Sequence, residues 1–293
     1  MPLDLKKFAG RLRVTDGAWG TQLQRMGLPA GSPPELWNVE NASAVEEVAR
    51  GYVEAGSDVI ITNTFGANRF VLQKHGAGER VGELAEAGAA ISRRAAGTQA
   101  KVFGSVGPTG RIVMMQEVPA KELSAAYAEA AGALAGGGAD AIVLETFNEL
   151  ADAEIALKAV RSACDLPVVV SMTFASGPDK TATMMGDSPA DLVQMAKANA
   201  ADAVGANCGT GPDKYVTIAE MLRQATTQDL PIWIKANAGL PQIVDGETVF
   251  PMAPAEFASY VPKLITAGAN FIGGCCGTTP EHIRAIRAAV DNR

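Results

Sequence analysis

The sequence repeats one local pattern about eight times: a short run rich in β-branched residues, a polar turn, and a longer stretch with helical periodicity. Several of the runs are apolar at every position, which is typical of strands buried on both faces of a parallel sheet. We expect strands at residues 12–15, 58–63, 101–106, 140–145, 167–173, 203–207, 231–236 and 270–274. Eight alternating units in 293 residues predict an α/β fold of a single domain, a (β/α)8 TIM barrel over residues 1–293.

The segments between these runs carry the signals of amphipathic helices. Apolar residues recur at helical spacing in 45–53 and again in 123–130. Residues 188–191 and 279–281 each offer a capping hydroxyl, a proline and an acidic residue, which is typical of a helix start. An open doubly wound sheet is the alternative fold, but residues 16–20 lack the G-x-G-x-x-G spacing that usually follows its first strand.

The composition excludes several classes of protein. With 47% hydrophobic and 19% charged residues the chain has an ordinary globular composition, and its net charge of −7 argues against binding to nucleic acid. The first residues lack the charged segment and apolar core of a signal peptide, and no apolar run is long enough to span a membrane. Four cysteines in this length do not indicate a disulfide framework. We therefore expect a cytoplasmic protein with metal-binding or catalytic thiols.

Three of the four cysteines lie directly after expected strands. Cys208 follows the sixth strand, and Cys275 and Cys276 follow the eighth, between glycines. Because the carboxyl ends of barrel strands share one rim, the three thiolates are expected to bind one Zn2+ and to leave its fourth position open. Inert buried thiols and a vicinal disulfide between Cys275 and Cys276 are the alternatives. Cys164, at the end of a helix, is expected to be a packed free thiol.

Other polar residues end or follow strands at the same rim. Asp16 follows the first strand, Thr64 the second and Asn237 the seventh, while Glu145 ends the fourth. An acid placed after four apolar strand residues favours a binding role for Glu145 over a solvated one. For Asp16, capping of the next turn is an equal alternative. His282, in the first turn of the last helix, is expected to be solvated or to cap that helix, and a role in supporting the metal ligands is the less favoured alternative.

At these positions the chain resembles the homocysteine S-methyltransferase family, and within it the homocysteine-binding barrel of the cobalamin-dependent methionine synthases. The resemblance runs almost from end to end, and its most specific part is Gly-Gly-Cys-Cys-Gly-Thr-Thr-Pro-Glu-His at 273–282. Seven further motifs support it, at residues 16–21, 62–67, 107–110, 145–147, 172–174, 207–208 and 237–239.

The resemblance implies roles for residues at this rim. The matching cysteines of the family bind zinc, and the asparagine that matches Asn237 lies near the metal, where it can fill the open position without substrate. The acids that match Asp16 and Glu145 hold the ammonium group of homocysteine. We expect backbone amides near Gly17 and Thr64 to receive its carboxylate. The implied function is zinc-dependent S-methylation of homocysteine to methionine.

The methyl donor is less constrained. The resemblance covers only the barrel of the multidomain synthases, so a methylated corrinoid carried by a separate protein is the expected donor. The chain itself has Gln73 where the corrinoid-binding D-x-H-x-x-G motif requires aspartate before His75 and Gly78. We therefore expect Zn2+, and not cobalamin, to be its own cofactor.

Two further classes of function remain as alternatives. Betaine would need an aromatic cage, to which Trp19 and Trp37 can contribute, but Thr146 follows Glu145 where the betaine enzymes have tyrosine. Trp19 also replaces the smaller residue usual in the family. Sulfonium compounds are other possible donors. A non-catalytic zinc- and homocysteine-binding subunit, or a thiol sensor, is the alternative outside enzymes.

Overall fold

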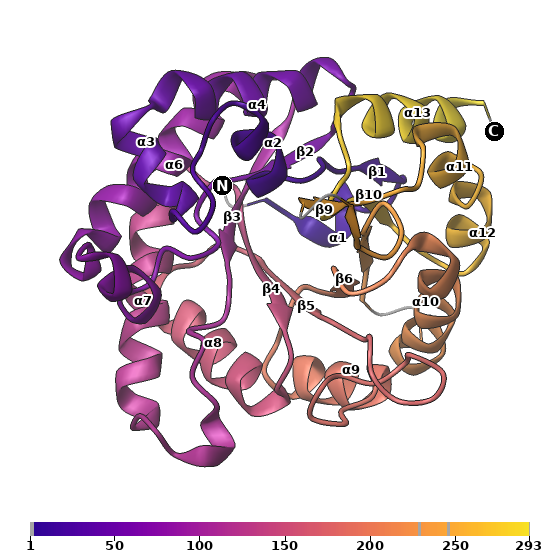
Figure 1. Cartoon of the computed structure of the whole chain (residues 1–293). Helices are drawn as coiled ribbons and strands as arrows, with labels where there is room; N and C mark the ends of the chain where they lie inside the picture. The colour runs from indigo at the N-terminus through magenta and orange to yellow at the C-terminus, as the bar shows by residue number, and fades with distance from the viewer. Residues whose placement is uncertain (1–2, 228–229, 245–246, 293) are drawn as a thin grey trace.

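Eight parallel strands form one sheet that curves into a barrel (Figure 1). The computed structural model of the chain describes residues 3–227, 230–244 and 247–292. Its sheet has the order β1-β10-β7-β6-β5-β4-β3-β2, and a parallel bridge between Thr15 and Val59 joins the two end strands. The strands are β1 (Arg13–Val14), β2 (Val59–Ile61), β3 (Lys101–Val106), β4 (Ala141–Phe147), β5 (Val168–Met172), β6 (Ala203–Asn207), β7 (Ile232–Ala236) and β10 (Phe271–Gly274).

Helices surround the barrel as an outer ring (Figure 1), which confirms the (β/α)8 fold. The longer ones are α4 (Ala42–Glu54), α6 (Val81–Ala96), α7 (Ala120–Gly136), α8 (Leu150–Ala163), α9 (Pro189–Ala198), α10 (Pro212–Thr226) and α13 (Pro280–Asp291). The short ones are α1 (Leu5–Phe8), α2 (Gly20–Arg25), α3 (Trp37–Glu40), α5 (Arg69–Leu72), α11 (Pro254–Ala258), α12 (Val261–Thr266), η1 (Pro34–Leu36), η2 (Gln73–His75), η3 (Gly78–Arg80) and η4 (Val113–Met115). None of the helices in the described part of the chain has the length and apolarity needed to traverse a bilayer.

Two helices begin as their sequences predict. The Ser188 hydroxyl accepts a hydrogen bond from the Asp191 N–H, and the Asp191 carboxylate accepts one from the Ser188 N–H, which closes a capping box on α9. Thr279 caps α13 in the same way, with His282 in the third helical position. An antiparallel hairpin, β8 (Gln242–Val244) with β9 (Glu247–Val249), follows β7 and was not expected.

Aromatic side chains fill the barrel interior near the amino ends of the strands. The ring of Trp233 stacks on Phe103 at 5.7 Å between centroids and lies 5.3 Å from the ring of Phe271. All three side chains are buried and come from the first half of their strands. This packed layer confines the open space of the barrel to the carboxyl ends of the strands.

At the amino ends of the strands, the same hydrogen-bonding arrangement recurs at every second strand. The residue before the strand accepts a hydrogen bond from a backbone N–H of the preceding strand and also pairs with an arginine. The four acceptors are Asp58, Asp140, Asp202 and Asn270, and their N–H donors are Val14, Val102, Val168 and Ile232, at 2.8–2.9 Å. Their arginines are Arg287, Arg93, Arg161 and Arg223. These clamps tie the strands together at their amino ends.

Candidate active site

Three thiols converge at the carboxyl ends of β6 and β10. The sulfur atoms of Cys208, Cys275 and Cys276 all lie within 4.8 Å of one another, and those of Cys208 and Cys276 are 3.9 Å apart. All four cysteines of the chain are free thiols, so Cys275 and Cys276 form no vicinal disulfide. Cys164 lies apart from the cluster, at the end of α8.

Cys208 is held in a left-handed backbone conformation with φ of 64°. Such a conformation costs a residue with a side chain about 1–2 kcal/mol and persists only where neighbours enforce it. Here the Tyr215 hydroxyl donates to the Cys208 carbonyl at 2.6 Å, and the Cys208 N–H donates to the Lys235 carbonyl at 3.1 Å. In this conformation the Cys208 thiol lies beside those of the other two cysteines.

The turn that carries Cys275 and Cys276 is fixed by its neighbours. The Asn237 side-chain oxygen accepts a hydrogen bond from the Cys276 N–H at 3.1 Å, and the Thr278 hydroxyl donates to the Cys275 carbonyl at 2.7 Å. Gly277 has a φ of 80°, and a side chain there would overlap Phe250. Glycine is therefore required directly after the cysteine pair.

His282 supports this turn from the first turn of α13. Its Nδ1 atom accepts a hydrogen bond from the Thr279 N–H at 3.2 Å, and its Nε2 atom lies 3.0 Å from the Met252 carbonyl oxygen. The ring is 5% exposed, and burial lowers the pKa of His282. The expected capping role is confirmed, and the alternative of a solvated histidine is wrong.

The thiols influence one another strongly. Hydrogen bonds from Cys275 and Cys276 lower the pKa of Cys208 to about 3, whereas the same contact with Cys208 raises the pKa of Cys275 to about 12. The pKa of Cys276 is also raised by its two neighbours. Without a cation, one thiolate thus suppresses ionisation of the other two. Three soft sulfur donors that need a positive charge to ionise together suit Zn2+.

Glu145 is a buried acid close to the thiols. Its side chain is 5% exposed, and the Ser105 hydroxyl donates a hydrogen bond to it at 2.5 Å. Burial raises the pKa of Glu145 to about 7, although the positive charge of Lys235 opposes that shift. The carboxyl therefore changes charge near neutral pH. At a pH above this pKa it is ionised and can accept a hydrogen bond from a cationic ligand.

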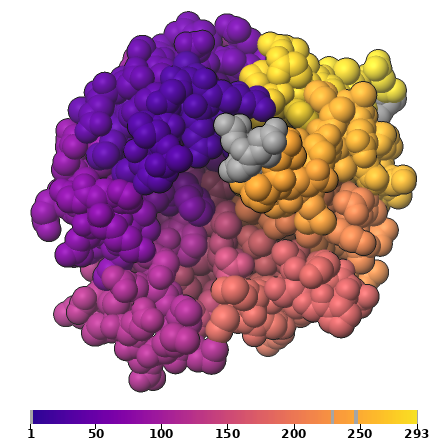
Figure 2. All heavy atoms as spheres, in the orientation of Figure 1, coloured from indigo at the N-terminus to yellow at the C-terminus, as the bar shows by residue number. Residues whose placement is uncertain are grey.

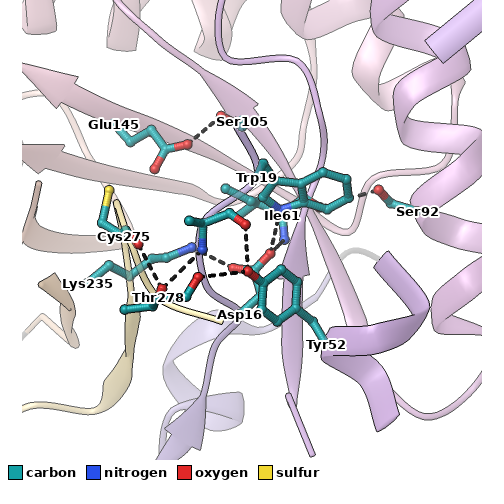
Figure 3. Close-up of polar contacts among 11 residues, drawn as sticks. Asp16, Trp19, Tyr52, Ile61, Ser92, Ser105, Glu145, Lys235, Cys275 and Thr278 are labelled. Carbon is teal, nitrogen blue, oxygen red and sulfur yellow. Dashed lines mark hydrogen bonds and ion pairs between the residues drawn. The ribbon is translucent and has the colours of Figure 1, made fainter. Parts of the chain in front are cut away.

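Asp16 follows β1 as expected, and its carboxylate is bonded within the protein. Its side chain is fully buried, and one oxygen pairs with the ammonium of Lys235 at 2.5 Å. The other oxygen accepts hydrogen bonds from the Trp19 indole at 2.9 Å and the Ile61 N–H at 2.8 Å (Figure 3). Asp16 is not among the residues that line the cavity, whereas its partner Lys235 is. Its role in binding the substrate ammonium stays a prediction.

A cavity of about 390 Å3 opens above these residues, and the surface is hollowed near the middle of the same face in Figure 2. Of the predicted residues it is lined by Gly17, Thr64, Glu145 and the three cysteines. Within the described part of the chain, the N–H groups of Gly17 and Thr64 have no hydrogen-bond acceptor. They are available to an anionic ligand. Asn237 lies behind the cysteine turn rather than in the lining.

The remaining predicted residues are dispersed. Trp19 lines the cavity, but Trp37 does not, so the two do not form a cage there. His75 and Gly78 lie in η2 and η3 on the outside of the barrel. Lys235 lines the cavity but was not among the predicted residues. A lysine inside an otherwise apolar strand is the signal that could have identified it.

Comparison with known proteins places the chain in a family. Residues 13–290 match the family model described as homocysteine S-methyltransferase. The methionine synthases of Mycobacterium tuberculosis (strain ATCC 25618 / H37Rv) and Mycobacterium leprae (strain TN) are 33% and 32% identical to it. Both alignments cover 98% of this chain and 25% of the relative, so the chain spans about a quarter of their length.

Solved structures agree on the fold. The oxidized form of the homocysteine methyltransferase MmuM from Escherichia coli is 25% identical, with a TM-score of 0.78 over 94% of this chain and 95% of that one. Its metallated form is 24% identical, with a TM-score of 0.81 over 98% and 99% of the two chains. The chain belongs to the homocysteine S-methyltransferase family of enzymes.

Proposed function

We propose that this barrel binds Zn2+ through Cys208, Cys275 and Cys276 and methylates the thiol of homocysteine to form methionine. The observation that carries the proposal is the convergence of three thiols in a cavity that also holds the buried acid Glu145. Bound zinc supplies the positive charge that lowers the pKa of a thiol and makes its thiolate available at neutral pH. In the part of the chain described, no other group of metal-ligating residues of this kind is found.

The surrounding residues would orient the amino acid. Glu145 accepts a hydrogen bond from the ammonium group, and the N–H groups of Gly17 and Thr64 donate to the carboxylate. Asn237 holds the backbone of Cys276, which we prefer to the direct metal contact implied by the sequence. Asp16 acts on the substrate through Lys235, because its own oxygens are already bonded.

The rim of the cavity favours a methyl donor carried by another protein. Exposed apolar side chains follow four strands around the mouth of the barrel, at Phe65, Met114, Met115, Met184, Leu240 and Ile243. Flexible methionines suit an adaptable docking surface, whereas a small soluble donor gains nothing from such a rim. We therefore propose a methylated corrinoid held by a separate protein as the donor. Betaine is less well supported, since Trp37 does not line the cavity and so cannot form an aromatic cage there with Trp19.

The donor can be tested directly. Zinc-loaded protein and homocysteine are mixed in turn with a methylated corrinoid protein, free methylcobalamin, betaine, S-methylmethionine and S-adenosylmethionine, and methionine is measured by mass spectrometry. We expect turnover with the corrinoid protein, and slower turnover when Met114 and Met115 are both replaced by serine. Turnover with a small cationic donor alone would contradict the donor assignment. Tight homocysteine binding with no turnover would favour the non-catalytic alternative.

A further inference from the structure

Lys235 is a buried cation at the base of the substrate cavity. It lies in β7, whose other residues are apolar, and its side chain is 1% exposed. It nevertheless lines the cavity together with Glu145 and Cys275. An ammonium group is expensive to remove from water unless it is paired and hydrogen-bonded. A lysine in this position therefore needs an opposite charge and hydrogen-bond acceptors around its ammonium group.

The protein itself supplies the opposite charge but only some of the hydrogen-bond acceptors. An ammonium has three N–H donors, and among the described residues the structure gives it one acceptor, the Asp16 carboxylate at 2.5 Å. Asp16 is itself held by Trp19 and Ile61, so the ion pair is anchored in place. Figure 3 shows the Lys235 side chain reaching toward Asp16, with Cys275 and Glu145 in the same view. The ammonium also lies 5.8 Å from the centroid of the Trp233 ring, but no second oxygen or nitrogen acceptor is found for it among the described residues. It can therefore still donate a hydrogen bond to a ligand.

The charges around the cavity match those of an amino acid. Glu145 offers a negative charge, and Lys235 offers a positive one. Burial alone would lower the pKa of Lys235, but attraction to Asp16 and Glu145 raises it, so the ammonium stays charged. Gly17, whose N–H has no acceptor among the described residues, directly follows Asp16 in the chain and lines the same cavity as Lys235.

We propose that Lys235 donates a charged hydrogen bond to the α-carboxylate of the thiol substrate, beside the N–H groups of Gly17 and Thr64. In this role it selects thiols that carry a carboxylate, while Asp16 positions its ammonium. The inference rests on the proposed function, since it assigns one part of the same substrate. Charged hydrogen bonds of this kind contribute more than neutral ones.

The competing role for Lys235 is to balance the negative charges of Asp16 and of the thiolates. That role makes a different prediction. Loss of a balancing charge weakens every thiol ligand by a similar factor, whether or not the ligand has a carboxylate. Loss of a carboxylate ligand weakens only the compounds that have one.

The test measures binding to zinc-loaded protein by calorimetry, without any methyl donor. Three ligands are compared: homocysteine, homocysteamine, which lacks the carboxylate, and mercaptobutyrate, which lacks the ammonium. The variants are Lys235→Met, and Lys235→Met with Asp16→Asn, which removes both buried charges together and protects the fold. Lys158→Met, at an exposed position of α8, is the matched control, and zinc content is measured for every protein.

We expect the wild type to prefer homocysteine to homocysteamine, and both Lys235 variants to lose about tenfold or more of that preference. Their preference for homocysteine over mercaptobutyrate should remain, and Lys158→Met should behave as wild type. Equal weakening of homocysteine and homocysteamine would overturn the inference while leaving the proposed function intact. Failure of the zinc-loaded wild type to bind homocysteine would instead refute the proposed function, and the inference with it.

Discussion

The two ends of this barrel use polar residues in opposite ways. At the amino ends of the strands, each clamp residue is satisfied within the protein: Asp58 accepts hydrogen bonds from the Val14 N–H and from Arg287. At the carboxyl ends, the N–H groups of Gly17 and Thr64 have no acceptor among the described residues. Satisfied groups stabilise the fold, and unsatisfied ones are available to a ligand. Substitutions at the two ends should therefore separate stability from function.

The largest effect is expected at the thiol cluster. Cys275→Ser should abolish zinc binding and lower the methylation rate roughly a thousandfold or more, because the metal contributes several kcal/mol to the reaction. The free energy of unfolding of the metal-free protein should change by only about 1 kcal/mol. Metal analysis, methionine formation and urea denaturation measure the three quantities. A zinc-free variant with full activity would refute the assignment.

A clamp at the opposite end should show the reverse behaviour. Asp58→Ala removes the partner of Arg13, Arg287 and the Val14 N–H. It should lower the free energy of unfolding by about 2–3 kcal/mol, since it leaves buried donors unpaired. Urea denaturation at neutral pH measures the loss. Homocysteine affinity should stay within about twofold of the wild type, and a large loss of affinity with unchanged stability would show that the two ends are not separate in this way.

The pH dependence of binding sharpens the description of the carboxyl-end site. Because burial raises the pKa of Glu145 to about 7, its carboxyl is mostly protonated at pH 6 and mostly ionised at pH 8. Only the ionised form pairs with an ammonium, so this group should weaken homocysteine binding by about tenfold as the pH falls over that range. Calorimetry at several pH values on the wild type and Glu145→Gln isolates the contribution. Identical pH slopes for the two proteins would exclude it.

The smallest effect is expected at the remaining cysteine. Cys164 is half-buried at the end of α8 and lies outside the cluster. Cys164→Ser should bind zinc as the wild type does, and its free energy of unfolding should change by about 0.5 kcal/mol or less. Loss of zinc from this variant would mean that the metal site differs from the one described.

The sequence predicted the strands and the cysteine cluster better than the side-chain pairings within the site. Strands β3 and β6 have the expected bounds. They were predictable because the sequences of buried parallel strands are nearly continuous apolar runs. The cysteine cluster was also predictable, since strand order alone brings the ends of β6 and β10 to one rim. Both signals are local or follow from topology.

The role of Asp16 was not predictable in the same way. It depends on a pairing with Lys235, 219 residues away in the sequence, and a single lysine within an apolar strand does not by itself indicate its partner. The β8–β9 hairpin was missed although Asp245-Gly246, which lies outside the described residues, is a dipeptide typical of hairpins. Local sequence patterns only weakly indicate side-chain pairs across the barrel and additional structure in its loops.

X-ray absorption at the zinc edge can show whether the three protein thiolates bind zinc and leave one position open. Zinc-loaded wild type should show three sulfur ligands at about 2.3 Å and one lighter ligand. Addition of homocysteine should convert this set to four sulfur ligands, because the substrate thiolate occupies the open position. Four sulfur ligands before homocysteine is added, or a coordination sphere that homocysteine leaves unchanged, would rule out an open three-thiolate site.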